Sequence, residues 1–123
     1  MNANEFTKEL ITRYQKNNGR ELSYEDLGSF LCEIIESNSG LYSVPLNKKT
    51  AARIIHEFQK NVLKLPDLDW GDATAFLDIY DCKVCANALA QCYLRGYISP
   101  VNEKIIGGDE IITDPESIIY RFC

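Results

Sequence analysis

The sequence contains no apolar run of the roughly 18 to 20 residues that a membrane-spanning helix requires. Its opening residues, MNANEFTKEL, also lack the basic stretch and the apolar stretch of a secretory signal peptide. These absences predict a protein that is not inserted in a membrane. We expect it in the cytoplasm, or at the cell surface if the sequence is a fragment of an exported protein.

Positive charge is also in short supply. Thirteen lysines and arginines face 18 aspartates and glutamates, so the formal net charge is -5. Because a negative protein repels phosphate backbones at long range, we expect no binding to nucleic acid. Hydrophobic residues at 46% and charged residues at 25% are ordinary globular values, which fit one domain over residues 1–123.

Catalytic signatures are scarce as well. The one histidine, His56, falls on the expected solvent side of a helix, and no G-x-S-x-G nucleophile motif is present. The segment IIGGDE lacks the lysine and the following helix of a phosphate-binding loop. Asp67, Asp69 and Asp72 could belong to a calcium-binding loop of twelve residues that starts at Asp67. Its twelfth position is then Asp78, where such a loop needs glutamate. We therefore expect no enzyme, no metal and no cofactor.

The cysteines leave two interpretations open. There are five, and an odd number favours a reducing compartment over a secreted disulfide framework. Cys82 and Cys85 form the only C-x-x-C pair, and Cys92 lies seven residues after Cys85 on the same expected helical face. The favoured interpretation treats Cys85 and Cys92 as small apolar core residues. The alternative is a cysteine-dependent metal-binding or redox protein that uses all three.

What the sequence does contain is a succession of helical signals. Apolar residues recur at helical spacing, and residues that favour N-caps stand at Ser23, Asn47, Asp81 and Thr113, the last with Glu116 as a capping box. The sequence NNG, which ends at Gly19, offers a left-handed stop for the first helix. We expect helices over residues 4–16, 24–37, 47–64, 81–95 and 113–122, with a short helical turn over 71–76.

The loop between the last two helices has a weaker signal, which would allow residues 97–98 and 104–106 to pair as a tiny two-stranded element. Four aromatic side chains, Trp70, Tyr80, Tyr93 and Tyr97, are expected near this helix–loop junction. The expected fold class is all-α, a compact bundle of about five helices.

Residues 76–122 carry the most specific pattern. They read FLDIYDCKVCANALAQCYLRGYISPVNEKIIGGDEIITDPESIIYRF. The positions that carry the pattern are Phe76, Asp78 and Ile79 in an opening segment, Ala88, Leu89, Cys92, Gly96 and Ile98 in a first helix, and Ile112, Thr113 and Glu116 at the start of a second. This spacing resembles an S-layer homology (SLH) repeat. The resemblance implies a helical hairpin and a non-catalytic binding module.

An internal echo repeats this plan. Residues 27–63 and 84–122 each run through a helix, a glycine, a loop and a capped helix, and Leu46 in the first copy stands where Ile112 stands in the second. Since short helical repeats bury their apolar faces against one another, we expect the two copies to fold as one helical unit.

The resemblance also implies a ligand groove. Lys48 takes the slot of the family's arginine in the first copy, and Lys48 and Asp78 would form the floor of the groove, with Tyr80 and Asp114 at its rim. Asp114 replaces the arginine of the second copy and reverses the charge there, which disfavours anionic wall polymers. We expect recognition of a protein partner or binding of a neutral or cationic ligand, or else divergent binding of a cell-surface glycan. A small intracellular regulatory protein that shares only the helical scaffold is a further alternative.

Overall fold

The computed structural model describes residues 1–37 and 44–122. The regular elements in this part of the chain are α1 (Ala3–Asn18), α2 (Tyr24–Leu27), α3 (Ser29–Glu36), α4 (Lys48–Asn61), a 3₁₀ helix η2 (Gly71–Ala75), α5 (Ala86–Leu94) and α6 (Pro115–Phe122). Two isolated antiparallel bridges, Asn2 with Pro45 and Asn47 with Ile111, add a trace of β pairing. The expected all-α class is confirmed. No helix among the described residues combines the length and the apolar character that crossing a bilayer would need.

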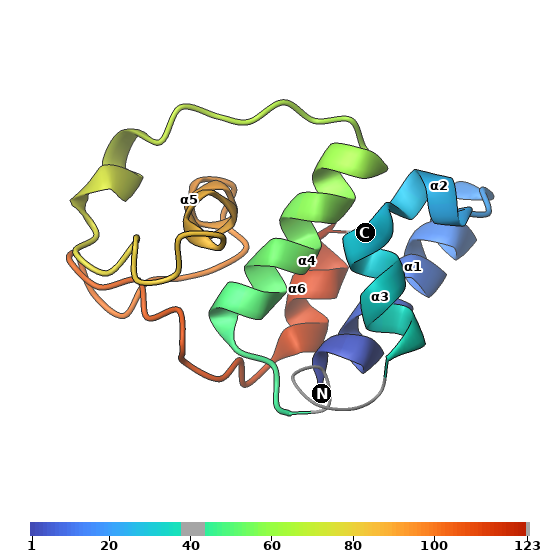
Figure 1. Cartoon of the computed structure of the whole chain (residues 1–123), viewed down its shortest axis with the longest axis horizontal. Coiled ribbons are helices and arrows are strands. Elements are labelled where there is room, and N and C mark those ends of the chain that lie inside the picture. Colours follow the sequence, from blue (N-terminus) through green and yellow to red (C-terminus); the bar gives the residue numbers. More distant parts are fainter. Residues whose placement is uncertain (38–43, 123) are drawn as a thin grey trace.

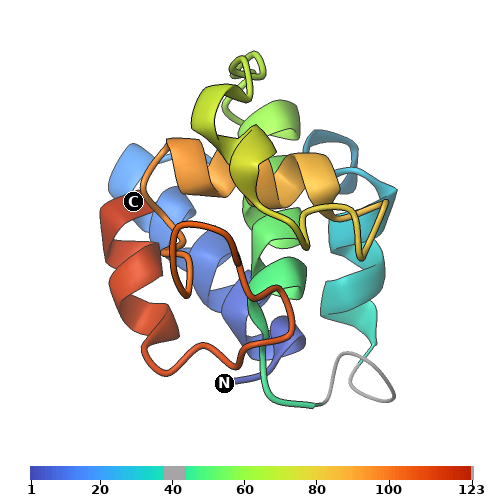
Figure 2. The same ribbon diagram turned by 90° about the vertical axis from the view of Figure 1, so that its left-hand side faces the viewer.

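Helix α4 is the central element. It packs against α1, α2 and α3 on one side and against α5 on the other, as Figures 1 and 2 show. The side chains that face these neighbours are fully buried, among them those of Ala51, Ala52, Ile54, Ile55 and Phe58. Because a helix enclosed by neighbours must be apolar around much of its circumference, this run of residues makes α4 the element that joins the two halves of the chain into one core.

Two of the expected N-caps are confirmed. The Ser23 side chain accepts a hydrogen bond from the N–H of Asp26, and the Asn47 side chain accepts one from the N–H of Thr50. Helix α1 ends as its sequence predicts, at Gly19, whose φ of 60° lies in the left-handed region that glycine adopts without a steric penalty.

The expected helix over residues 24–37 is wrong as a single element, because it breaks at Gly28. The φ of Gly28 is 87°, and the Asn61 side chain of α4 donates a hydrogen bond of 2.6 Å to the carbonyl of Leu27. A Cβ at position 28 would lie 2.6 Å from the Asn61 Nδ2 atom. The close approach of α4 therefore requires glycine here, and it separates α2 from α3.

Helix α5 begins later than predicted. The expected start was at Asp81, but the first helical residue is Ala86. The residues in between form turns, in which the N–H of Cys85 donates to the carbonyl of Cys82, and a disulfide joins the two side chains. A helix from Asp81 would need a different backbone over this closed turn.

The cap of the last helix also differs from the prediction. Asp114, not Thr113, accepts a hydrogen bond through its carboxylate from the N–H of Ser117, at 3.3 Å. Pro115 is the first residue of α6, where its missing N–H costs nothing.

The expected pairing of residues 97–98 with 104–106 is wrong. The described chain has no strand over these positions. Instead, the N–H of Val101 donates to the carbonyl of Ile105, and the Asn102 side chain accepts from the N–H of Ile105. The loop is built from local turns, which leaves its backbone to be held by side chains from elsewhere.

Candidate functional site

The loop over residues 97–111 is held by a buried lysine on α4. Lys48 is 8% exposed, and its Nζ atom donates to the carbonyl oxygens of Ser99 at 2.7 Å and Ile106 at 3.1 Å. It also pairs with the Glu110 carboxylate at 2.8 Å. An ammonium group has three N–H donors, so these three acceptors occupy all of them. Lys48 therefore joins α4 to the loop through hydrogen bonds and an ion pair.

The carboxylate of Asp78 also holds this loop. Asp78 accepts hydrogen bonds from the N–H groups of Ile106 at 2.9 Å and Gly107 at 3.0 Å, one on each oxygen. Next to it, the N–H of Leu77 donates to the carbonyl of Lys104 at 2.8 Å. Residues 77 and 78 are in this way fixed to the loop by three hydrogen bonds.

Two of the expected ligand-binding residues thus meet at one loop residue. Lys48 binds the carbonyl of Ile106 and Asp78 binds its N–H, while the Ile106 side chain is fully buried. The structure brings Lys48 and Asp78 together as anchors of the loop. The charged group of each one makes hydrogen bonds to backbone atoms of the loop.

The other two expected residues make different contacts. Asp114 caps α6 and borders, with Lys48, a shallow pocket of about 280 Å³. Tyr80 is 65% exposed and stacks on Trp70, with ring centroids 5.6 Å apart and an interplanar angle of 30°. The Trp70 Nε1 atom donates to the side chain of Asn87 at 2.9 Å, which fixes the indole under the tyrosine. Of the four, Tyr80 and Asp114 are exposed, and Tyr80 is the one with a large apolar side chain.

Tyr80 is flanked by two further exposed apolar side chains, which the sequence interpretation missed. Leu77 is 76% exposed and Val84 is 73% exposed. We call Leu77, Tyr80 and Val84 the 77–84 face. The signal that could have found it is the occurrence of large apolar residues in a stretch without a helical period, since such residues have no helix face on which to be buried.

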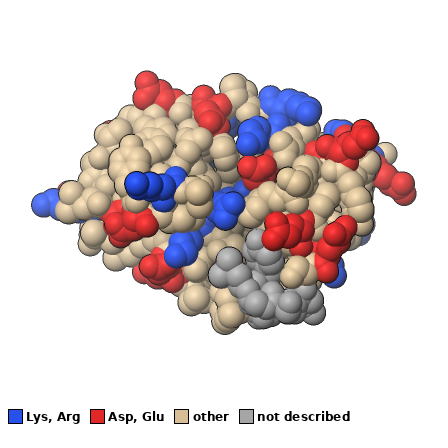
Figure 3. Space-filling model, viewed as in Figure 1, with Lys and Arg blue, Asp and Glu red and all other residues tan. Residues whose placement is uncertain are grey.

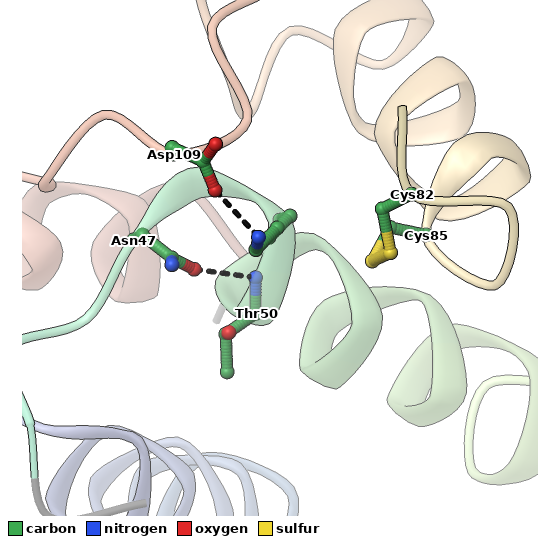
Figure 4. The surroundings of a disulfide bond; sticks show 6 residues. Asn47, Thr50, Cys82, Cys85 and Asp109 are labelled. Atoms are coloured by element: carbon green, nitrogen blue, oxygen red, sulfur yellow. Dashed lines mark hydrogen bonds and ion pairs between the residues drawn. A yellow bond between two sulfur atoms is a disulfide. The ribbon is translucent and has the colours of Figure 1, made fainter. Parts of the chain in front are cut away.

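The disulfide overlaps this face, because Val84 lies between the two bonded cysteines. Cys82 is half-buried, whereas Cys85 is 3% exposed and occupies the N-cap position of α5. Figure 4 shows the bond on the segment before α5, directed toward the first turns of α4. The expectation that Cys85 is a simple apolar core residue is therefore corrected: it is buried, but it is bonded to Cys82. The odd number of cysteines gave no sign of this bond.

Cys92 does not join the pair. It is fully buried and its Sγ atom contacts the carbonyl oxygen of Ala52 at 3.6 Å, and burial raises the pKa of its thiol to about 12. Over residues 1–37 and 44–122 there is no group of three or more His, Cys, Asp and Glu side chains placed to hold a metal ion.

A network of polar side chains holds the Trp70 indole on which Tyr80 of the 77–84 face stacks. His56, expected at the surface, is half-buried, and its Nε2 atom lies 2.8 Å from the Asp67 carboxylate. The other Asp67 oxygen accepts from the Asn87 side chain at 2.9 Å, and Asn87 in turn accepts from Trp70. The hydrogen bond from His56, followed by the one from Asn87, lowers the pKa of Asp67. The network connects α4, α5 and the indole on which Tyr80 stacks.

Comparison with known proteins gave no match among family models, curated protein sequences or solved structures. The functional argument therefore depends on the residues and contacts above.

Proposed function

We propose that this chain is a non-catalytic recognition module of SLH-like type that binds a protein partner through the 77–84 face. The observation that carries the proposal is the exposure of three large apolar side chains, Leu77, Tyr80 and Val84, within eight residues of one segment. Apolar side chains gathered at a surface and fixed in place are typical of interaction sites.

The rigidity of the segment supports recognition. Leu77 and Asp78 are hydrogen-bonded to the 97–111 loop, and Tyr80 is stacked on Trp70. The disulfide closes the turn that contains Val84. A surface that is already ordered loses little conformational entropy when a partner binds, so more of the contact energy contributes to affinity.

The charges around the face indicate the chemistry of the partner. Asp69, Asp72 and Asp81 are exposed on the same part of the chain, with Lys83 as an exposed cation between the cysteines. Figure 3 shows a largely uncharged surface on the left of the molecule, with scattered charged groups, and more numerous acidic groups on the right. A partner with an apolar pocket and basic residues at its rim fits this arrangement.

The SLH-like assignment has its own support in the hydrogen bonds between the two copies of the echo. The N–H of Ile112 donates to the carbonyl of Leu46 at 2.9 Å, and these two residues occupy equivalent places in the copies. One residue further in each direction, Asn47 bridges Ile111. Pairing of equivalent positions is what a repeat of helix, loop and capped helix would produce. Residues 38–43 of the first copy lie outside the described part.

The test uses a photo-crosslinking amino acid, p-benzoylphenylalanine, placed at Leu77 in the full chain in its native cells. The matched control carries the same group at Tyr24, which is 63% exposed on α2. We expect one protein to be crosslinked at position 77 and not at position 24. Tyr80→Ser should abolish the capture, whereas Tyr24→Ser should leave it unchanged.

Two results would overturn the proposal. Equal crosslinking at both positions would mean that the face has no partner of its own. Strong retention of the purified protein on an anionic wall polymer, unaffected by Tyr80→Ser, would place recognition elsewhere and favour the glycan-binding alternative.

A further inference from the structure

The Cys82–Cys85 pair borders a cavity that the proposed recognition function does not use. The cavity has a volume of about 300 Å³, and Cys82 is one of its lining residues together with Lys49, Leu89 and the glycines at 107 and 108. Cys85 is not in the lining; it is buried at the start of α5. Cys82 is therefore the half of the disulfide that borders the cavity, and Cys85 is enclosed.

We propose that Cys82–Cys85 is a thiol–disulfide exchange site that accepts neutral or cationic thiols. Cys82 is the sulfur that is attacked and Cys85 is the leaving group. The assignment follows from the geometry, since attack requires access to the sulfur, and Cys82 has that access through the cavity.

The position of Cys85 suits a leaving group. It occupies the N-cap of α5, a nine-residue helix that has no side-chain cap hydrogen bond. The positive end of the helix dipole at this place favours a thiolate and acts against the effect of burial, and a more stable thiolate leaves faster.

The reaction balances with a thiol as the only co-reactant. A thiolate R–S⁻ attacks Cys82 Sγ, the new sulfur–sulfur bond forms, and the Cys82–Cys85 bond breaks with its electron pair on Cys85, which takes a proton from solvent. A second thiolate attacks the R sulfur of this mixed disulfide and releases R–S–S–R, and Cys82 leaves as a thiolate that is protonated. Two thiols are oxidised and the protein disulfide is reduced to two thiols by two electrons and two protons.

The preference for neutral or cationic thiols comes from the charge of the cavity. Its lining contains one lysine, Lys49, against four carboxylates, those of Asp78, Asp81, Asp109 and Glu110. Lys49 is paired with Asp109, and Glu110 is paired with a lysine outside the lining. Asp78 and Asp81 then leave the site negative beside Cys82, which repels an anionic thiolate-bearing molecule more than a cationic one.

The other described cysteines serve as internal references. Cys92 is fully buried, and Cys32 is half-buried with its pKa raised by burial. Both should react far more slowly than Cys82, so peptide mapping by mass spectrometry can separate exchange at the proposed site from modification elsewhere.

The first experiment tests which sulfur is attacked. Full-length Cys85→Ser and Cys82→Ser variants are treated with cystamine, and the mixed disulfides are mapped by mass spectrometry. We expect cysteamine to be added to Cys82 about tenfold faster than to Cys85, as accessible thiols react ahead of enclosed ones. The reverse order, or equal rates, would overturn the assignment of roles.

The second experiment tests the charge preference on the oxidised wild-type chain. Reduction by cysteamine, 2-mercaptoethanol and 3-mercaptopropionate is followed at low ionic strength, and each rate is divided by the thiolate concentration. We expect the cationic thiol to react about tenfold faster than the anionic one, with the difference largely lost near 1 M salt. Asp81→Asn should reduce this ratio, whereas Asp72→Asn, outside the cavity lining, should not. A ratio near one in the wild type would contradict the proposal.

The same assay separates an exchange site from a purely structural disulfide. A site that exchanges in the folded state is reduced at a rate that does not depend on sub-denaturing urea. A rate that rises in proportion to the unfolded fraction would mean that the bond is reached only by unfolding, and it would overturn the proposal.

Discussion

At the scale of single residues, Lys48 is the side chain on which the 97–111 loop depends most. We expect Lys48→Met to lower the free energy of unfolding by about 2–4 kcal/mol, because a buried carbonyl group, a partly buried one and a carboxylate lose their donor. Lys49→Met is the control: its partner Asp109 is 87% exposed, so the loss should stay below about 1 kcal/mol. Urea denaturation of both variants measures the difference. Equal losses would mean that Lys48 is not a special anchor.

Gln59 offers a prediction of the opposite sign. It is 2% exposed, and its Nε2 atom has no hydrogen-bond partner among the described residues. Since a buried amide without a partner costs about 1–3 kcal/mol, Gln59→Met should leave stability unchanged or raise it by about 1 kcal/mol. Thermal and urea unfolding test this. A loss of stability would show that the amide is satisfied in solution.

The His56–Asp67 pair predicts a response to acid. The pKa of Asp67 is lowered in the folded state, so its contribution to stability is present above its unfolded pKa of 3.8 and is lost as pH falls through the folded pKa. Wild type should therefore exceed Asp67→Asn in urea midpoint at pH 6, and the two should converge as the pH falls through the lowered folded pKa. Asp72→Asn is the matched surface control. A constant difference between wild type and Asp67→Asn at all pH values would contradict this origin of the effect.

At the scale of elements, Gly28 decides that α2 and α3 are separate helices. Gly28→Ala places a side chain at a φ of 87° and 2.6 Å from Asn61, so we expect a loss of about 2–4 kcal/mol. In a double-mutant cycle, Asn61→Ala should cost less in the Gly28→Ala background than in the wild type, because the hydrogen bond to Leu27 is already disturbed. Additive effects would mean that the two positions are not coupled.

The helices that were predictable from sequence are those with local signals. The caps at Ser23 and Asn47 and the stop at Gly19 depend on residues within one turn, and they were recognised. The break at Gly28 depends on Asn61, 33 residues away, and the late start of α5 depends on a covalent bond. Neither of these causes alters the spacing of apolar residues along the chain, so neither could be predicted from that spacing.

The candidate site divides in the same way. Lys48 and Asp78 could be named from the spacing that resembles an SLH repeat, but not their common contact. Lys48 reaches Ile106 across 58 residues and Asp78 reaches it across 28, which only the folded chain makes visible. Leu77 and Val84 were missed because large apolar residues in a stretch without a helical period do not show by themselves which of them are exposed.

At the scale of the whole molecule, α4 has two structural roles. Its buried face holds α1, α2 and α3, while its first residue anchors the loop that fixes residues 77 and 78. The 77–84 face is therefore supported by the core without belonging to it. Substitutions on the face should change binding with little change in stability, which is the behaviour expected of a recognition surface.

The most direct test of this account is the affinity for the partner captured at position 77, measured by calorimetry with purified proteins. Leu77→Asp and Val84→Asp should each raise the dissociation constant by about 30-fold or more, which is the usual effect of removing a central apolar contact. Tyr24→Ser, at a comparably exposed site, should change it less than about twofold. If the two face variants bind as tightly as the wild type, the 77–84 face is not the recognition surface.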